Sequence, residues 1–356
     1  MSIDFAPIGT AGLDRFQELR GAAIDAVTER FYASYADDYA EFGQAGRDAC
    51  REDLGYHLDF LRPVLEFGIV QPMVDYLRWL ASVLVTRAVP AEHLPLSLDW
   101  LAEFFASHMQ APEAQIVVKA LQYTKAEFLR ADDAKPAIYD MMPSAWQESE
   151  SFERALLAGD RKAARMLLEQ CLQRGHNLID AELHMIQPAL YEIGHKWQNN
   201  QVTVAQEHLA TAIAQSVMTF GLLQMEIPAS SGRRVLLACV AGNNHAVGLQ
   251  MVSDAFQMAG WQVQYLGANV PSSALIAQVR LFKPALLGLS VSFAQQLRVV
   301  KDLMSRLKES LGTERPAVIV GGMAINQFNR LAGEFGADGW SPNAAEAVTL
   351  AAKLAA

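Results

Sequence analysis

The chain has 356 residues, of which 51% are hydrophobic and 19% are charged. This length predicts about two or three domains, and the composition excludes a disordered chain. The formal net charge of −10 disfavours nucleic acids and anionic membrane surfaces as partners.

Three cysteines lie far apart, and their spacing suggests neither a disulfide framework nor a zinc site. The first residues lack a basic region followed by an apolar run, and no stretch has the length of a spanning helix. We therefore expect a cytoplasmic protein with no membrane association.

The first part of the chain has the pattern of an all-helical domain. Apolar residues recur at helical spacing from about residue 13 to residue 130, and we expect breaks at Pro63, Pro72, Pro90 and Pro95. A polar stretch that ends at Pro136 stops the pattern. The predicted first domain is residues 1–135.

Residues 136–228 are expected to form a four-helix bundle. The helical pattern resumes near residue 144, with Ser149 or Ser151 as a possible first N-cap. A second break, rich in Pro, Ser and Gly, covers 228–232 and marks the end of this domain.

Residues 229–356 read as a doubly wound parallel sheet of the Rossmann or flavodoxin type. Short apolar runs at 234–240, 261–266, 285–290 and 317–320 alternate with helical stretches. In such α/β sheets a ligand lies beyond the carboxyl ends of the strands, where the strand order reverses. The loops after these strands are therefore the first place to look for a site.

The loop after the first strand contains Asn243, His245 and Gly248. An imidazole at a strand end can coordinate a metal held by a cofactor, and Asn243 is placed to fix the ring tautomer by a hydrogen bond. Gly248 lets the following helix approach a bulky group. The alternative is an ordinary histidine at a helix start or in a core.

This loop resembles the Asp-x-His-x-x-Gly signature of cobalamin-binding domains, with Asn243 in the aspartate position. The resemblance implies that His245 is the lower axial ligand of cobalt. It also implies a tunnel for the nucleotide tail, lined by Ser290, Ser292, Gly321 and Gly322. Each element alone is also compatible with an ordinary strand-to-helix turn. A neutral Asn243 should make the imidazole a weaker donor to cobalt than an aspartate would.

In the bundle, Trp197 is followed ten residues later by Glu207 and His208. This spacing is similar to the Trp-x9-Glu-His element of adenosylcobalamin-dependent photoreceptors, which implies that the three residues contact the adenosyl group. The alternative is a bundle core tryptophan and a surface pair. Repressor members of that family have a histidine directly after the tryptophan, where this chain has Gln198. The upper cobalt ligand after illumination is therefore open, with water, His195 and His208 as the choices.

Two helical faces of the first domain suggest a cofactor slot with aromatic walls. The alternative is a helical core with a satisfied histidine. Together with the bundle and sheet, this globin-like domain resembles the photocobilins, which hold biliverdin beside cobalamin. A thioether to Cys50 is the alternative to non-covalent binding. The implied bilin contacts are Asp53, Tyr56, His57, Phe60, Tyr76 and Trp79.

The resemblance implies a light-sensing signalling protein rather than an enzyme. Photolysis of the cobalt–carbon bond would change a homo-oligomer, a dimer or a tetramer, and the signal would pass to a separate output protein. The alternatives are a corrinoid methyl carrier of a methyltransferase system and a haem-binding, globin-like sensor with His57 as ligand. A cobalamin mutase is disfavoured because no eightfold repeat of strand and helix is present.

Overall fold

The computed structural model describes residues 5–86, 89–90, 92–130 and 144–354. The chain divides into two compact units, Met1–Lys135 and Pro136–Ala356. Each unit is described here by itself. Within the described residues, no helix has the length and apolar character needed to cross a membrane.

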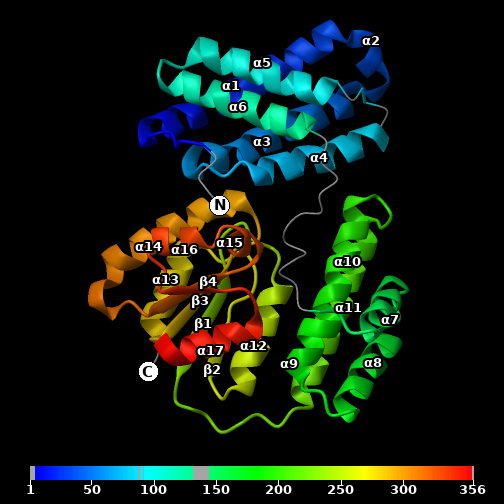
Figure 1. Cartoon of the computed structure of the whole chain (residues 1–356), viewed down its shortest axis with the longest axis vertical. Coiled ribbons are helices and arrows are strands. Elements are labelled where there is room, and N and C mark those ends of the chain that lie inside the picture. Colours follow the sequence, from blue (N-terminus) through cyan, green and yellow to red (C-terminus); the bar gives the residue numbers. More distant parts are fainter. Residues whose placement is uncertain (1–4, 87–88, 91, 131–143, 355–356) are drawn as a thin grey trace. The chain divides into compact units, whose positions relative to one another are not determined.

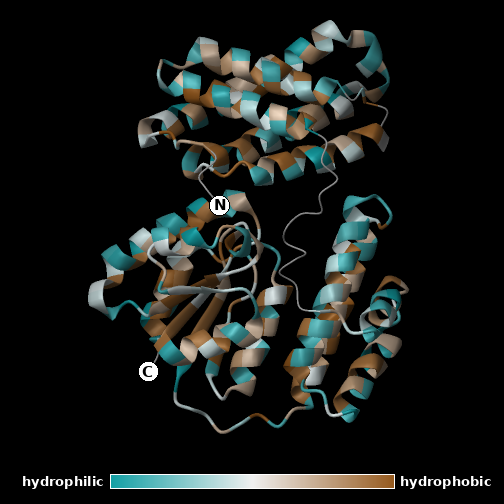
Figure 2. Ribbon diagram, in the orientation of Figure 1, coloured by the Kyte–Doolittle hydropathy of each residue, from teal (hydrophilic) through white to brown (hydrophobic). Residues whose placement is uncertain are grey.

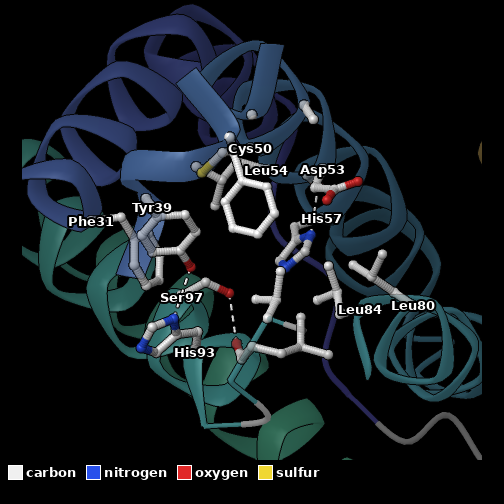
Figure 3. A pocket seen from close by; sticks show the side chains of 15 residues that line it. Phe31, Tyr39, Cys50, Asp53, Leu54, His57, Leu80, Leu84, His93 and Ser97 are labelled. Carbon is white, nitrogen blue, oxygen red and sulfur yellow. Dashed lines mark hydrogen bonds between the residues drawn. The ribbon is translucent and has the colours of Figure 1, made fainter. Parts of the chain in front are cut away.

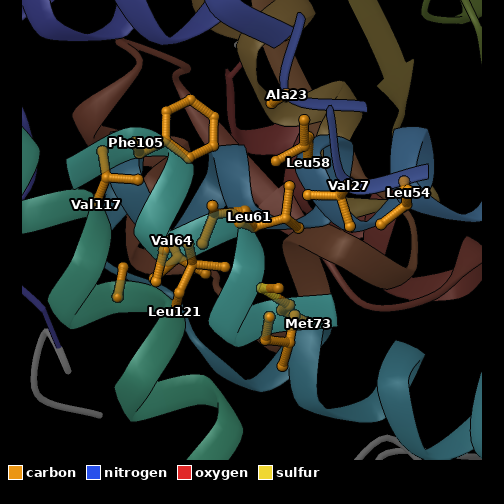
Figure 4. Close-up of a cluster of buried hydrophobic side chains, with 14 of the residues drawn as sticks. Ala23, Val27, Leu54, Leu58, Leu61, Val64, Met73, Phe105, Val117 and Leu121 are labelled. Carbon is orange, nitrogen blue, oxygen red and sulfur yellow. The ribbon is translucent and has the colours of Figure 1, made fainter. Parts of the chain in front are cut away.

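The first unit is all-helical, and its helices surround one apolar core (Figure 1). Helix α3 supplies Leu54, Leu58, Leu61 and Val64, whose spacing of three and four residues places them on one buried face. Figure 4 shows Leu54 beside Val27 at one end of this cluster and Phe105 beside Val117 at the other. The helices are α1 (Thr10–Ser34), α2 (Ala36–Tyr39), α3 (Gly43–Phe67), α4 (Gln71–Thr86), α5 (His93–His108) and α6 (Glu113–Leu129).

Two of the expected proline breaks are wrong. Pro63 lies inside α3, where its ring is buried in the core, and the helix ends only at Gly68, which has a left-handed φ of 69°. Pro95 lies in the first turn of α5, where a missing N–H costs no intrahelical hydrogen bond. Tertiary packing and position within the helix therefore outweigh the local signal.

The second unit begins with a helical bundle. Neither Ser149 nor Ser151 caps its first helix, because the helix begins one turn earlier and its N-cap is Gln147. A π-helical turn, Glu182–Ile186, joins α9 to α10. The bundle helices are α7 (Glu148–Leu157), α8 (Arg161–Gln173), α9 (Leu178–Ala181), α10 (Gln187–Gln198) and α11 (Val204–Leu223).

The rest of the second unit is the expected doubly wound fold, which the structure confirms. All described strand pairs are parallel, in the order β2-β1-β3-β4-β5, so the order reverses between β1 and β3. The last strand, β5, was not expected, because its three residues are too few to give a pattern. The strands are β1 (Arg234–Cys239), β2 (Gln262–Tyr265), β3 (Leu286–Ser290), β4 (Ala317–Gly321) and β5 (Gly339–Ser341).

Helices cover both faces of this sheet (Figure 1). Leu249 and Phe256 of α12 and Ala347 and Ala351 of α17 pack on the same side of the sheet core. Figure 2 shows the strands as an apolar layer between these mixed helices. The helices are α12 (Val247–Met258), α13 (Ser272–Phe282), α14 (Leu297–Leu311), α15 (Met323–Gln327), α16 (Arg330–Glu334) and α17 (Ala344–Leu354).

The bundle packs on the sheet domain through α12. Met251 and Ala255 of α12, with Ala344 of α17, belong to the same apolar cluster as the bundle core. Two hydrogen bonds also join Gln250 of α12 to α11. Its Nε2 donates to the Thr219 hydroxyl, and its Oε1 accepts from Nε2 of Gln215, each at 3.4 Å. Helix α12 therefore has one side in the sheet core and the other in the bundle core.

Gly322, directly after β4, provides a test of this fold. Its φ is 91°, and an added Cβ would lie 2.6 Å from the carbonyl oxygen of Val291. We expect Gly322→Ala to lower the free energy of unfolding by about 2–5 kcal/mol, measured by urea denaturation. In the control, Gly333→Ala, the added Cβ meets no atom within 4 Å. Equal stability of the two variants would contradict the described approach of β3 and β4.

Candidate functional site

The loops that follow β1 and β3 flank the reversal of strand order, and the loop after β4 lies beside the loop after β3. The loop after β1 carries Asn243 and His245, β3 ends at Ser290, and β4 ends at Gly321. Because the strands are parallel, their carboxyl ends lie at one edge of the sheet. The structure therefore brings these sequence-predicted residues together.

Asn243 joins two of these loops through its fully buried side chain. Its Nδ2 donates to the Ser290 carbonyl at 3.0 Å, and its Oδ1 accepts from the His245 amide at 3.1 Å. The expected hydrogen bond to the histidine ring is therefore wrong. Both polar atoms of the side chain already bind backbone atoms, so Asn243 positions the histidine residue through its backbone and not through its ring.

A second amide, Gln296, was not predicted from the sequence. Its Nε2 donates to the Gly242 carbonyl at 2.9 Å, and its Oε1 accepts from the backbone amides of Ser292 and Phe293, each at 3.1 Å. This side chain thus ties the loop after β3 to the loop after β1. Such a contact depends on tertiary structure, and no local sequence signal could have found it.

His245 is exposed at the sheet edge, immediately before α12. The Phe293 ring lies edge-on to it, with 4.9 Å between ring centroids. Partial desolvation of the ring by the surrounding loops lowers the pKa of His245 from its ordinary value, while the carboxylate of Glu207 opposes this shift. The imidazole is therefore neutral at pH 7, the state in which a ring nitrogen can donate an electron pair to a metal.

The backbone beside His245 is held from a third direction. The Tyr265 hydroxyl, at the end of β2, donates to the Ala246 carbonyl at 3.0 Å. Burial raises the pKa of Tyr265 to about 12, so the hydroxyl stays protonated and keeps this hydrogen bond. The histidine loop is thus fixed by groups from β2, β3 and the segment after β3.

Glu207 lies in the first turn of α11, which a capping box of Thr203 and Gln206 begins. Its Oε1 accepts from the Thr211 hydroxyl at 2.9 Å, and its Oε2 lies 2.5 Å from Nδ1 of the exposed His208. The carboxylate of Glu207 raises the pKa of His245, so it lies close enough to the histidine for their charges to interact. Helix α11 also contacts α12, which begins two residues after His245.

Trp197 lies half-buried in the last turn of α10, and Gln198 is the exposed last residue of that helix. His195 is also exposed, with its Nε2 3.1 Å from the side-chain nitrogen of Asn199. The tryptophan is therefore on the helix hairpin that also carries Glu207, as the spacing suggested.

The three predicted glycines differ in what surrounds them. Gly248 is exposed, and an added Cβ would meet no atom within 4 Å, so the start of α12 is open to a bulky group. Cβ atoms on Gly321 and Gly322 would instead meet the Ser341 carbonyl at 3.0 Å and the Val291 backbone. Neighbouring protein backbone therefore explains why these two positions are glycine, whereas the sequence had suggested only the approach of a nucleotide tail.

Two buried acceptors at the same edge of the sheet lack a hydrogen bond within the described residues. They are Oε1 of Gln295, after β3, and Oδ1 of Asn326, after β4. Such orphaned acceptors are uncommon in folded proteins and are often satisfied by a ligand or ordered water. They are the second feature that sequence reasoning missed.

The first unit holds a separate cavity of about 120 Å³ between α3, α4 and α5 (Figure 3). Asp53 and His57 line it together with Tyr39, Cys50 and His93. Of the six predicted bilin contacts, only Asp53 and His57 therefore belong to the lining. Pockets for drug-sized ligands usually measure about 300–1,000 Å³.

His57 is buried, and its ring faces this cavity (Figure 3). Its Nδ1 lies 2.6 Å from the Asp53 carbonyl and 3.0 Å from the Tyr76 hydroxyl. Burial lowers the pKa of His57 to about 4, so the ring is neutral at pH 7. Since a carbonyl only accepts, the proton is on Nδ1, and Nε2 carries the lone pair.

The other predicted bilin residues lie around His57 without lining the cavity. Phe60 and Tyr76 stack with ring centroids 4.2 Å apart, and Trp79 lies 6.3 Å from Tyr76. Tyr56 is 45% exposed and donates to Glu52, so it points away from the core. Of these four predicted residues, Phe60, Tyr76 and Trp79 therefore form an aromatic group beside His57, whereas Tyr56 is exposed to solvent.

Comparison with known proteins gives a consistent picture for the second unit. A family model described as a B12 binding domain matches residues 233–349, and a second model with the same description matches residues 148–220. These ranges coincide with the sheet domain and the bundle.

Individual relatives carry two kinds of name. The chain is 30% identical over 199 residues to the HTH-type transcriptional repressor CarH of Myxococcus xanthus, an alignment that covers 56% of this chain and 65% of the repressor. It therefore spans less than two thirds of that protein. It is also 30% identical over 167 residues to dimethylamine corrinoid protein 3 of Methanosarcina mazei, covering 46% of this chain and 99% of the relative.

A solved structure supports the architecture. The monomethylamine corrinoid protein of Methanosarcina barkeri superposes with a TM-score of 0.51 at 22% identity, over 58% of this chain and 98% of that one. At this identity the likeness establishes the shared fold of bundle and parallel sheet.

The bridging role of Asn243 can be tested by its removal. We expect Asn243→Ala to lower the free energy of unfolding by about 2–4 kcal/mol, because the Ser290 carbonyl and the His245 amide both lose their partner. The matched control is the adjacent, exposed Asn244→Ala, which we expect to change stability by less than about 0.5 kcal/mol. If urea denaturation gave equal losses for both, the bridge would not be what holds the loop.

Proposed function

The chain belongs to the family of proteins built on B12-binding domains, and from this we propose that it is a light sensor whose cobalamin is adenosylcobalamin. The family membership makes a cobalamin the cofactor. The adenosyl form, the response to light and the output are the proposal.

One observation carries the proposal. Glu207 lies in the first turn of α11 and His245 just before α12, and these two helices pack together, with the Glu207 carboxylate raising the pKa of His245. A methyl group offers no hydroxyl for Glu207 and His208 to bind, whereas the ribose of an adenosyl group offers two. The repressor CarH among the relatives also favours the light sensor over the methyl carrier.

The residues at the sheet edge fit a cobalamin. His245 is exposed and neutral, and the start of α12 at Gly248 is open. The buried acceptors of Gln295 and Asn326 can receive hydrogen bonds from the amide and hydroxyl groups of such a ligand. These features are independent of the family match.

Adenosylcobalamin, when bound, supplies a cobalt–carbon bond that visible light breaks. In the proposed mechanism His245 would ligate the cobalt through a ring nitrogen, while Asn243 and Tyr265 hold the backbone on either side of it. Glu207 and His208 would accept hydrogen bonds from the ribose, and Trp197 would pack against the adenosyl group. Loss of that group would leave these bundle residues without their contacts.

The bundle is the part of the molecule that such a loss would disturb. We propose that it then changes its association with a second copy of the chain, as a dimer or tetramer, and that a separate protein reads the change.

Biliverdin as a second chromophore stays a prediction. The cavity of the first unit, at about 120 Å³, is smaller than a linear tetrapyrrole requires, so its residues do not fit that group in this conformation. The same argument applies to haem at His57. Binding of either group would require displacement of lining side chains such as Leu80 and Leu84.

The second candidate function is a corrinoid methyl carrier. The dimethylamine corrinoid proteins among the relatives favour it, since almost the whole of one of them aligns with this chain. A carrier would use His245 in the same role. It would not require Glu207 and His208 to contact a ribose, which separates the two functions experimentally.

The first experiment is an absorbance spectrum of the protein reconstituted with adenosylcobalamin and biliverdin, recorded in the dark and after green illumination. We expect an irreversible change of the cobalamin bands, and a far-red band if biliverdin is taken up. In His245→Ala the dark spectrum should lose the features of histidine ligation, while the exposed control His176→Ala keeps them. A cobalamin spectrum indifferent to light would favour the methyl carrier.

The adenosyl contact can be tested separately. We expect the combined change Glu207→Ala and His208→Ala to weaken adenosylcobalamin about 10- to 100-fold, because two hydrogen-bond acceptors are lost. Hydroxocobalamin, which has no ribose at the upper face, should bind with nearly unchanged affinity. Titrations that gave equal losses for both cobalamins would refute the adenosyl contact.

A further inference from the structure

Two acidic side chains are buried where the bundle meets the sheet domain. Glu182, the first residue of the π turn, has no exposed surface, and Asp254 of α12 is 3% exposed. Helices α9 and α12 contact each other here. Neither residue belongs to the cobalamin loop, and neither was singled out by the sequence.

No described N–H or O–H group satisfies this pair. Both carboxyl oxygens of Glu182 and Oδ2 of Asp254 are buried and have no such partner. The two carboxyl groups instead face each other within hydrogen-bond reach. Two carboxylates cannot hydrogen-bond to each other, so one of the two must hold a proton for this contact to exist.

The surroundings supply no compensating charge. The adjacent side chains of α9 and α12, among them Leu178, Ala181, Met251 and Ala255, are apolar. Burial raises the pKa of both carboxyl groups, and the pKa of Asp254 rises to about 6. The pKa of Glu182 is raised by burial and also by the negative charge of the nearby Asp254.

Few other titratable groups act on this pair. Asp254 raises the pKa of the Tyr265 hydroxyl on β2, which therefore stays protonated. In the described part of the chain, no lysine, arginine or histidine shifts the pKa of either carboxyl. The elements packed against the π turn and α12 also carry Asp180 of α9, His184 of the π turn, Glu148, Glu150, Glu153 and Arg154 of α7, Tyr191, Glu192, His195 and Lys196 of α10, Glu207 and His208 of α11, Arg234 and Cys239 of β1, and Glu346 and Lys353 of α17.

We propose that Glu182 and Asp254 share one proton, and that this proton latches the bundle to the sheet domain. With the proton present, the pair is a hydrogen bond across a dry interface. When the proton leaves to solvent, two carboxylates face each other in an apolar contact, which favours separation of α9 from α12 because water can then solvate both.

The sign of the pH dependence follows from the raised pKa values. A carboxyl whose pKa is raised by docking favours the docked state below the pKa of a free carboxyl, about 4. That advantage is lost as the pH rises through the values in the docked state, which for Asp254 is about 6. The free energy that holds the bundle to the sheet domain therefore falls as the pH rises from mildly acidic to mildly alkaline values.

The latch concerns the docking of the bundle and does not depend on light sensitivity. The contact between the bundle and α12 lies within the second unit and is present whichever of the two functions holds. The test therefore uses the full-length protein without cofactor, and its outcome is independent of the spectra described above.

The experiment is hydrogen exchange measured by mass spectrometry at about pH 5 and about pH 8, corrected for the intrinsic effect of pH on exchange. In the wild type we expect protection of the α9 and α12 peptides to fall about tenfold or more at the higher pH. Glu182→Gln should remove this fall, because the amide donates permanently to Asp254. Peptides of the first unit serve as an internal reference.

Two further variants keep the outcome decisive. Asp254→Asn, the reciprocal change, should flatten the pH dependence in the same way. Asp302→Asn, on the exposed side of α14, should leave it as in the wild type. Wild-type protection that does not change with pH, or an equal fall in Glu182→Gln, would overturn the latch. If Glu182→Gln did not fold, Asp254→Asn alone would decide between these outcomes.

Discussion

The site depends on one buried amide. Asn243 links the start of the histidine loop to the end of β3 through two hydrogen bonds to backbone atoms. Gln296 and Tyr265 hold the same loop from two further segments. Because all of these groups bind backbone atoms, the loop has a fixed path that positions the imidazole at the sheet edge. A large ligand would therefore approach an edge that is already folded.

The fold of the second unit could be predicted because its signals are local. Apolar runs of strand length, separated by helical periods, require only neighbouring residues to be recognised. Strand β5 was missed since Gly339, Trp340 and Ser341 form a strand only through their pairing with β4. The proline errors have the same origin, as the burial of Pro63 is a property of the tertiary core.

The candidate site was predictable in its residues and less so in their roles. Spacing located Asn243 and His245, but the partner of the Asn243 side chain depends on the position of Ser290, 47 residues away. Gln296, Gln295 and Asn326 follow no motif and become visible only where three loops meet. In the first unit, helical spacing grouped Asp53, Tyr56 and His57 correctly on one helix, yet it could not tell that Tyr56 lies toward solvent while His57 lies inside.

The π turn gives the bundle a mechanical property. Four of its five residues are buried, so the turn touches both α12 and the bundle interior, whereas an ordinary helical turn buries one side. Helix α10 runs from this turn for 12 residues, about 18 Å, to Trp197 near its other end. Helices bend most readily at such widened turns. A displacement of α10 beside Trp197 would therefore be expected to bend the chain at the π turn, where Glu182 lies beside the contact between α9 and α12.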